Sequence, residues 1–505
     1  MTQPASSPRH RGRFTLQQIK RVVSLLVGLF FRRITIQGTE NLPTDRGGIL
    51  VSWHPNGLVD PGLIFHACPR KVVFGARHGL FKIPLLSALM RAAGAVPVYR
   101  AVDMGKASDT ARQSGNQSMF DALSGAMASG AFAALFPEGV SHDAPHLVEL
   151  KTGAARIYYQ TRTSQPDAPT PAIIPVGLHY QRKRIFRSDV LIEFHPPIEL
   201  PPALDVTPPA HEGRDALRER ARDLTEEIER VLSDVIHATE SWDVHFLMHR
   251  ARALVRAERG YRAGAKQKRA RLSERVLGFA RIWTGYETRA KTHPAEVETL
   301  MSRVEQYDAD LRALGLSDRE IDRSPRLASI WLPVILVLQA ITVFLLFPPF
   351  LVVGYVVNLP AALVLELVVR QLAQEKKDIA TLKLLFGALI FPLAWLAFGL
   401  LGWWGHDHLI GYFPTLPTTP ILSGLVCGLM GPLGGAVAVR YLRVGRETAR
   451  GLRVRFTRKL RRRTLSRLRS ERSALCDAIL GLAQGLDLPG EVDIDGRIIP
   501  TPSED

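Results

Sequence analysis

The pattern of apolar and polar positions divides the chain into segments of different kinds. Between residues 34 and 200, short runs rich in β-branched residues alternate with stretches of helical spacing. This alternation is typical of an α/β domain with a largely parallel sheet, and a proline-rich stretch at 196–209 closes it. The pattern predicts helices over residues 80–93, 106–129 and 147–163, and strands over residues 34–37, 48–53, 72–76, 95–99, 131–136, 173–179 and 190–194.

The segments on either side of this α/β domain (34–209) are predicted to be helical. Residues 14–31 form an amphipathic pattern whose apolar centre, about ten residues long, is too short to cross a bilayer. We therefore expect the basic segment 1–33 to hold an in-plane membrane anchor, with a helix packed inside the protein as the alternative. Residues 210–327 are rich in Arg, Glu, Ala and Leu, which predicts a helical linker domain.

Residues 328–440 carry the strongest compositional signal. Four runs, 329–347, 350–369, 382–402 and 419–439, are almost free of charge, and each is long enough to cross a bilayer. An all-α transmembrane region of about four helices is expected, and two hairpins buried in a soluble domain are the alternative. Lys and Arg gather in the middle loop and are missing from the two opposite loops. The positive-inside rule therefore predicts that the α/β domain and the tail 441–505 face the cytoplasm.

The net charge of +17 over 505 residues is unevenly distributed. Residues 1–33 hold seven Lys and Arg and no acid, and residues 440–472 hold fourteen against two glutamates. Both segments adjoin apolar runs, which favours contact with anionic lipid headgroups over nucleic-acid binding, the competing interpretation. The three cysteines lie far apart, so they predict neither a disulfide framework nor a zinc site.

The sequence Val51-Ser-Trp-His-Pro-Asn-Gly-Leu-Val-Asp-Pro61 carries the first candidate chemistry. A predicted strand ends at His54, and a turn places Asp60 six residues later. Histidine is suited to take a proton near neutral pH, and a carboxylate on its other ring nitrogen fixes the tautomer. Taken alone, a histidine that merely satisfies groups in a turn is the commoner explanation.

Three further segments indicate a function only when they are considered in combination. Arg100 leaves a short predicted strand and offers a planar fork suited to a phosphate. Glu138 and Gly139 lie in a Pro-Glu-Gly turn that offers a carboxylate and a close backbone approach. The apolar run at 173–177 is suited to an acyl-chain pocket or to a core strand. Each of them alone is ordinary.

In this order and spacing, the four segments resemble the glycerophospholipid acyltransferase family over roughly residues 34–200. In that family four residues separate the histidine from the aspartate, whereas five separate His54 from Asp60. The family's third block usually reads Phe-Pro-Glu-Gly-Thr-Arg-Ser, whereas the sequence here is Phe136-Pro-Glu-Gly-Val-Ser-His-Asp143. Both departures are similar to a fungal-type branch that acylates glycerol 3-phosphate or dihydroxyacetone phosphate. Residues 285–318 also look like the helical region of that branch.

The resemblance implies roles for the candidate residues. His54 is implied as the general base and Asp60 as its orienting partner, while Arg100, Glu138 and Gly139 belong to the acceptor site. The implied partners are an acyl-CoA or acyl carrier protein donor, a glycerol 3-phosphate or lysolipid acceptor, and anionic membrane lipids. No metal, redox cofactor or nucleic acid is implied. The expected function is membrane-bound acyl transfer in phospholipid biosynthesis. Lysophosphatidate acylation and non-catalytic binding of lipid headgroups remain as alternatives.

Overall fold

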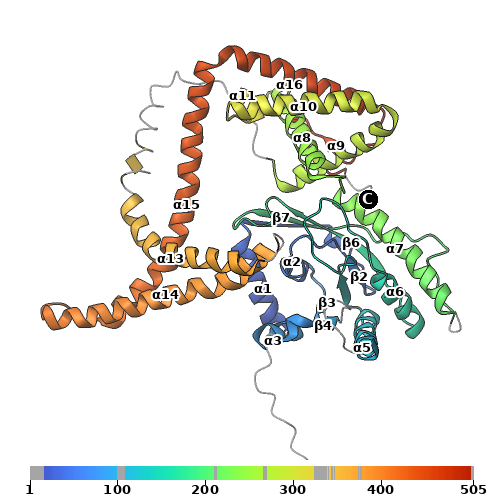
Figure 1. The fold of residues 1–505 in the computed structure, drawn as a ribbon, viewed down its shortest axis with the longest axis horizontal. Helices are drawn as coiled ribbons and strands as arrows, with labels where there is room; N and C mark the ends of the chain where they lie inside the picture. The colour runs from blue at the N-terminus through green and yellow to red at the C-terminus, as the bar shows by residue number, and fades with distance from the viewer. Residues whose placement is uncertain are drawn as a thin grey trace, which may run out of the picture. The chain divides into compact units, whose positions relative to one another are not determined.

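The computed structural model consists of two compact units (Figure 1). The first comprises Met1–Trp242 with Lys376–Thr381, and the second comprises Asp243–Glu375 with Leu382–Asp505. The structure describes residues 16–82, 84–98, 109–209, 213–265, 270–322, 338, 341–342, 345, 347–373, 375 and 378–501.

A seven-stranded sheet forms the centre of the first unit. The strand order is β1-β7-β6-β2-β5-β3-β4, and every neighbouring pair is parallel except β6 with β7. All seven predicted strands are present, so the prediction of an α/β fold with a largely parallel sheet is confirmed. The strands are β1 (Arg33–Gln37), β2 (Gly48–Val51), β3 (Val72–Arg77), β4 (Ala95–Val98), β5 (Phe132–Leu135), β6 (Ala172–Tyr180) and β7 (Asp189–Phe194).

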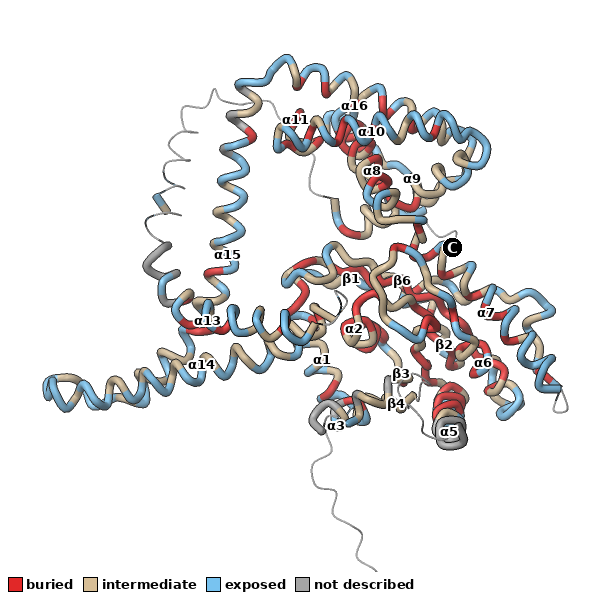
Figure 2. Tube along the Cα trace, viewed as in Figure 1, coloured by how far each residue is buried: buried red, intermediate tan, exposed pale blue. Residues whose placement is uncertain are grey.

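Helices pack on the sheet and bury its apolar residues (Figure 2). Side chains of α5, α6 and α7 share one core with residues of β2, β5 and β6, while α1 packs against α2. The predicted helices at 14–31, 80–93, 106–129 and 147–163 correspond to α1, α3, α5 and α6, and α2 was not predicted. The helices are α1 (Leu16–Phe30), α2 (Val59–Ala67), α3 (Pro84–Ala92), α5 (Asp109–Ala128), α6 (Gly153–Ser164) and α7 (Arg214–Ile236), with the short 3₁₀ helices η1 (Thr39–Asn41) and η2 (His78–Lys82).

Helix α7 extends the first unit beyond the predicted end of the α/β domain at residue 209. Ala221, Leu224, Ile228 and Leu232 recur at helical spacing and are buried in the sheet's own core. The contacts of the first unit therefore continue to Trp242.

In the part of the chain that the structure describes, the helical region of the second unit contains five helices and a small hairpin. Buried residues from α8, α10 and α16 meet in one core. Arg472 on α16 is fully buried and paired with Glu258 and Asp322. Part of the predicted basic tail is therefore a packed helix. The elements are α8 (Trp242–Arg262), α9 (Leu272–Thr292), α10 (Pro294–Ala313), α11 (Asp318–Asp322), α16 (Arg462–Leu482), β8 (Glu491–Val492) and β9 (Ile498–Ile499).

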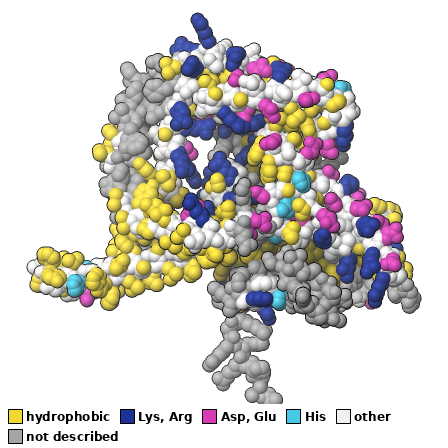
Figure 3. Space-filling view, viewed as in Figure 1, with side chains coloured by type: hydrophobic (Ala, Val, Ile, Leu, Met, Phe, Trp, Pro, Cys, Tyr) yellow, Lys and Arg dark blue, Asp and Glu magenta, His cyan; other side chains and the backbone are white. Residues whose placement is uncertain are grey.

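Among the described residues, three long apolar helices lie wholly or mostly in the second unit: α13 (Phe347–Leu372), α14 (Ile379–Tyr412) and α15 (Pro420–Leu460). Each contains a stretch long and apolar enough to cross a membrane. Hydrophobic side chains cover the surface around α13 and α14 in Figure 3. Three of the four predicted runs fall on these helices, and most of the run at 329–347 lies outside the described residues. The three helices support membrane association.

A polar contact joins these three helices. Asn358 of α13 donates a hydrogen bond to the Gly431 carbonyl of α15 at 2.9 Å, and the Trp395 indole of α14 donates to Asn358 Oδ1 at 3.0 Å. Apolar surroundings cannot satisfy an amide side chain, so such a contact favours one arrangement of the three helices.

Candidate active site

The candidate site lies where β2, β5 and β6 end. Because parallel strands place their carboxyl ends at one edge of a sheet, the segments that follow β2 and β5 meet there. The chain leaves β2 at Val51, turns through Gly57 with a φ of 52°, and enters α2 at Val59. A positive φ suits glycine because it has no Cβ. This turn places His54 before α2 and Asp60 in the first turn of that helix.

His54 and Asp60 are in direct contact. His54 Nδ1 lies 2.8 Å from Asp60 Oδ2, and the backbone amide of Asn56 donates to the same oxygen at 2.7 Å. Asp60 is fully buried, whereas the side chain of His54 is 19% exposed. When Nδ1–H donates a hydrogen bond to the carboxylate, the lone pair of Nε2 is left available to accept a proton. The turn therefore accommodates five intervening residues while keeping the His–Asp contact.

Tyr180, at the end of β6, is the third partner of Asp60. Its hydroxyl donates to Asp60 Oδ1. Burial, followed by the Asp60 charge, raises the pKa of Tyr180 well above its ordinary value, so the phenol stays a donor at neutral pH. Sequence reasoning missed Tyr180. The only signal was its position at a predicted strand end, and its approach to Asp60 depends on β6 pairing with β2.

Glu138 holds the same turn from the other side. Its buried carboxylate accepts from the His54 amide at 2.8 Å, from the Val148 amide at 3.2 Å, and contacts His142 Nε2 at 2.5 Å. Gly139 follows with a φ of 68°. Both Glu138 oxygens thus have protein partners, and the structure brings Glu138 and Gly139 next to His54.

Aromatic and polar contacts also hold the residues that follow β2 in place. The Phe136 ring stacks on the His54 imidazole with centroids 4.2 Å apart. The Ser52 hydroxyl donates to the Val176 carbonyl at 2.8 Å, and the Trp53 indole donates to the Leu178 carbonyl at 3.1 Å. Ile173, Ile174 and Val176 of the run at 173–177 are themselves buried in the core. These contacts restrict the motion of the imidazole, as a preorganised base requires.

The β6–β7 loop adds cations beside the site. Asp143 accepts from Lys183 Nζ at 2.6 Å and pairs with Arg184, and Asn56 Nδ2 donates to the Lys183 carbonyl at 3.2 Å. Burial acts to raise the pKa of Asp143, but the two cations outweigh it and lower that pKa below its ordinary value. Arg100, the predicted phosphate ligand, lies outside the described residues just beyond β4.

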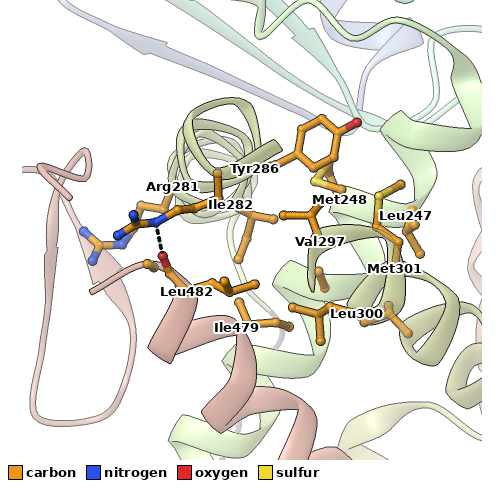
Figure 4. Close-up of a pocket in the computed structure, with 15 residues that line it drawn as sticks. Leu247, Met248, Arg281, Ile282, Tyr286, Val297, Leu300, Met301, Ile479 and Leu482 are labelled. Atoms are coloured by element: carbon orange, nitrogen blue, oxygen red, sulfur yellow. Dashed lines mark hydrogen bonds between the residues drawn. The ribbon is translucent and has the colours of Figure 1, made fainter. Parts of the chain in front are cut away.

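Possible metal ligands and a cavity of the helical unit are two further features of the residues that the structure describes. Among the residues that the structure describes, no group of three or more His, Cys, Asp or Glu side chains has the arrangement of a metal site. An apolar cavity in the helical unit, lined by side chains such as Met248, Tyr286 and Leu300, has a volume of about 70 Å³ (Figure 4). That is about half the ~150 Å³ of a cavity that holds one benzene, so it is too small for a fatty acyl chain.

Sequence comparisons match two parts of the chain. Residues 33–179 match the family described as Acyltransferase. Residues 257–487 match the family described as glycerol-3-phosphate acyltransferase 2 C-terminal domain. The predicted resemblance to this family over residues 34–200 is therefore confirmed for residues 33–179.

The curated proteins that the chain matches are distant relatives in sequence. The chain is 25% identical over 280 residues to glycerol-3-phosphate O-acyltransferase 2 of Saccharomyces cerevisiae, covering 53% of this chain and 35% of that protein. It is 29% identical over 120 residues to glycerol-3-phosphate O-acyltransferase 1 of the same yeast, covering 24% of this chain and 15% of that protein. An uncharacterized acyltransferase of Schizosaccharomyces pombe is 23% identical over 261 residues, covering 36% of this chain and 38% of that protein. The chain thus spans less than two fifths of the length of each relative.

The comparison with solved structures also found matches. One of them is the crystal structure of a 1-acyl-sn-glycerophosphate acyltransferase from Thermotoga maritima, which is 20% identical and superposes with a TM-score of 0.29. The match covers 43% of this chain and 79% of that chain.

Proposed function

We propose that this chain is a membrane-bound O-acyltransferase that transfers a fatty acyl group from an acyl thioester to the hydroxyl of glycerol 3-phosphate or dihydroxyacetone phosphate. The observation that carries the proposal is the contact of His54 Nδ1 with the buried Asp60 carboxylate, which leaves His54 Nε2 to accept a proton. The names of the two yeast relatives support glycerol 3-phosphate as the acceptor. Acyl-CoA and acyl carrier protein both provide the thioester.

In the proposed reaction, the acceptor hydroxyl attacks the thioester carbonyl carbon as His54 Nε2 removes its proton. The carbonyl oxygen becomes a tetrahedral oxyanion, which hydrogen-bond donors stabilise. When the carbon–sulfur bond breaks, the thiolate takes the proton from the imidazolium. The products are an ester and a free thiol, and His54 returns to its starting state. No covalent enzyme intermediate is required.

The surrounding residues support this chemistry in different ways. Asp60 orients the imidazole and stabilises its cationic form. Glu138 orders the His54 turn through its backbone amide, and Gly139 lets the backbone approach the acceptor. Arg100 is proposed to bind the acceptor phosphate, because its planar guanidinium accommodates two phosphate oxygens. With the domain on the cytoplasmic side of the membrane, soluble donors and acceptors have access to the site.

A thiol-release assay on membranes that carry the chain tests the proposal. We expect thiol release with glycerol 3-phosphate or dihydroxyacetone phosphate, and a loss of at least about 10³-fold in His54→Ala, because both the proton acceptor and its alignment are removed. His293→Ala changes an exposed histidine of the helical unit and serves as the matched control.

The acceptor that supports thiol release distinguishes the proposed function from its alternatives. Release only with lysophosphatidate would contradict the proposed acceptor and keep the mechanism. No release with any acceptor, for both acyl-CoA and acyl carrier protein donors, would overturn the enzymatic function and favour binding of lipid headgroups.

A further inference from the structure

Exposed apolar side chains form a stripe along α1. Val22, Leu25 and Leu29 recur at helical spacing and are 45%, 63% and 54% exposed. The opposite face of α1 is buried through Ile19 and Val27. The stripe is therefore an exposed surface of the first unit, on the segment whose pattern predicts an in-plane anchor.

The β6–β7 loop places two further exposed apolar side chains beside the last turn of α1. Ile185 is 49% exposed and Phe186 is 52% exposed. The Phe186 ring meets the Phe30 ring edge-on with centroids 6.0 Å apart, and the Arg187 amide donates to the Phe30 carbonyl at 2.6 Å. The backbone of the loop is thus tied to the last turn of α1, so that α1 and the loop form one structure.

The charge around this tip is positive. Residues 181–188 read Gln-Arg-Lys-Arg-Ile-Phe-Arg-Ser and contain four cations and no acid. Arg182 is exposed, and Arg187 holds a φ of 63°, a left-handed conformation that is uncommon outside glycine. Lys183 and Arg184 pair with Asp143, so Arg182 and Arg187 are the cations of this loop that lie on either side of the two apolar residues in sequence. Exposed apolar side chains beside arginines match the interfacial region of an anionic bilayer, where the apolar groups enter the acyl boundary and the guanidinium groups meet phosphates.

The same loop reaches the catalytic turn. The Lys183 carbonyl accepts from Asn56 Nδ2, the side chain between His54 and Asp60 in sequence. On the other side of that turn, the Leu58 amide donates to Thr381 Oγ1 at 3.2 Å. Thr381 lies in the first turn of α14, in the segment Lys376–Thr381 that groups with the first unit. The catalytic turn is thus bonded to the start of an apolar helix that is long enough to cross a membrane.

We propose that the β6–β7 loop is a membrane-inserting element, in which Ile185 and Phe186 enter an anionic phospholipid bilayer together with the exposed stripe of α1. The insertion holds the His54 turn at the membrane surface through the Lys183–Asn56 contact. A lipid product released there has a short path into the bilayer. The membrane contact itself does not depend on the acyl-transfer function and is tested without an activity assay.

The experiment places a fluorescent label at the tip and asks whether lipid or water surrounds it. The full chain carries Phe186→Cys in a Cys427→Ala background, since the remaining cysteines, Cys68 and Cys476, are buried. It is reconstituted in vesicles of phosphatidylcholine and phosphatidylglycerol. Leu217→Cys on α7, an exposed apolar position of the same unit, is the matched control.

We expect the label at position 186 to be quenched by doxyl-labelled lipid and protected from iodide, and the label at 217 to show the reverse. Quenching of position 186 by iodide alone would place the tip in water, and protection from both quenchers would place protein over it. Either result overturns the proposal. We further expect lipid quenching to fall when phosphatidylglycerol is omitted or when Arg182→Gln and Arg187→Gln are combined. Unchanged quenching would overturn the requirement for anionic lipid.

Discussion

The backbone amide of His54 donates a hydrogen bond to the Glu138 carboxylate at 2.8 Å. The two residues are 84 positions apart in sequence, and each follows a strand in the same parallel pair, β2 and β5. The sequence pattern implied that Glu138 serves the acceptor. In the structure, this buried carboxylate instead bonds protein groups, including the backbone amide of the proposed base. A role of Glu138 in positioning the turn would affect kcat, whereas a role in binding the acceptor would affect KM.

Glu138→Gln tests this difference. The amide keeps one oxygen but replaces the other with a donor, so the His54 amide and His142 cannot both be satisfied. If Glu138 positions the turn, kcat falls by about 10²-fold, the scale of a small misalignment in an active site, while KM for the acceptor changes little. Steady-state kinetics with varied acceptor measure both constants. A rise in KM with unchanged kcat would instead assign Glu138 to acceptor binding. Glu149→Gln, at a highly exposed side chain nearby, is the control.

Tyr180→Phe tests the third partner of Asp60. Loss of the phenol donor leaves the carboxylate less stabilised by hydrogen bonding, so it stabilises the imidazolium more strongly. We expect the acidic limb of the pH–rate profile to move to higher pH, with a rate loss of about tenfold near neutral pH. Tyr159→Phe removes a hydroxyl that bonds the Leu204 carbonyl, and it should leave the profile in place. An unshifted profile in Tyr180→Phe would show that the hydroxyl has only a structural role.

The stability of the first unit should fall in mild acid. Burial lowers the pKa of His195 from 6.5 to about 4, and burial with the neighbouring histidines lowers that of His179 well below 6.5. The unfolded chain therefore binds protons below pH 6.5 that the folded unit excludes. Stability is full above pH 6.5 and is lost towards pH 4, by at most about 1.4 kcal/mol per pH unit for each histidine. The raised pKa of Glu193 acts in the opposite direction at the acidic end.

Thermal unfolding in detergent between pH 7 and pH 4 measures this dependence. His195→Gln removes one titrating group, so its melting temperature should fall less steeply with acid than that of the wild type. His293→Gln, at an exposed position, should follow the wild type. Identical slopes in all three proteins would contradict the neutral state of His195 in the folded unit.

Arg472→Met tests the ion cluster in the helical unit. Arg472 is fully buried and bonds Glu258 at 2.8 Å and Asp322 at 2.7 Å. Removing the cation takes the buried partner from two carboxylates, and Arg262 beside Glu258 and Arg469 beside Asp322 are more exposed cations, so we expect a loss of about 3–5 kcal/mol in the free energy of unfolding. Arg467→Met breaks an exposed pair with Asp310 and should cost about 1 kcal/mol or less. Denaturant titration of both variants in detergent compares them, and equal losses would contradict the burial of Arg472.

Local patterns alone predicted most of the secondary structure. Strand periodicity and β-branched composition identified all seven strands of the sheet, because these signals depend on neighbours along the chain. Helix α2 was not predicted, because it lacks such a local signal. It is only nine residues long, and most of its side chains are buried, so it shows no polar stripe. The long charge-free runs identified α13, α14 and α15, because crossing a bilayer sets both length and composition.

Contacts between distant residues decided the rest. The sequence alone determined that this chain contains an α/β domain, a His54–Asp60 motif of acyltransferase type and apolar helices. The tertiary structure alone decided that Tyr180 reaches Asp60, that Glu138 bonds the His54 turn, and that Arg472 is buried in an ion cluster. The strand order brings Tyr180 and Glu138 to one sheet edge, and the packing of α16 buries Arg472. Neither follows from local spacing, because both depend on the packing of segments that are distant in sequence.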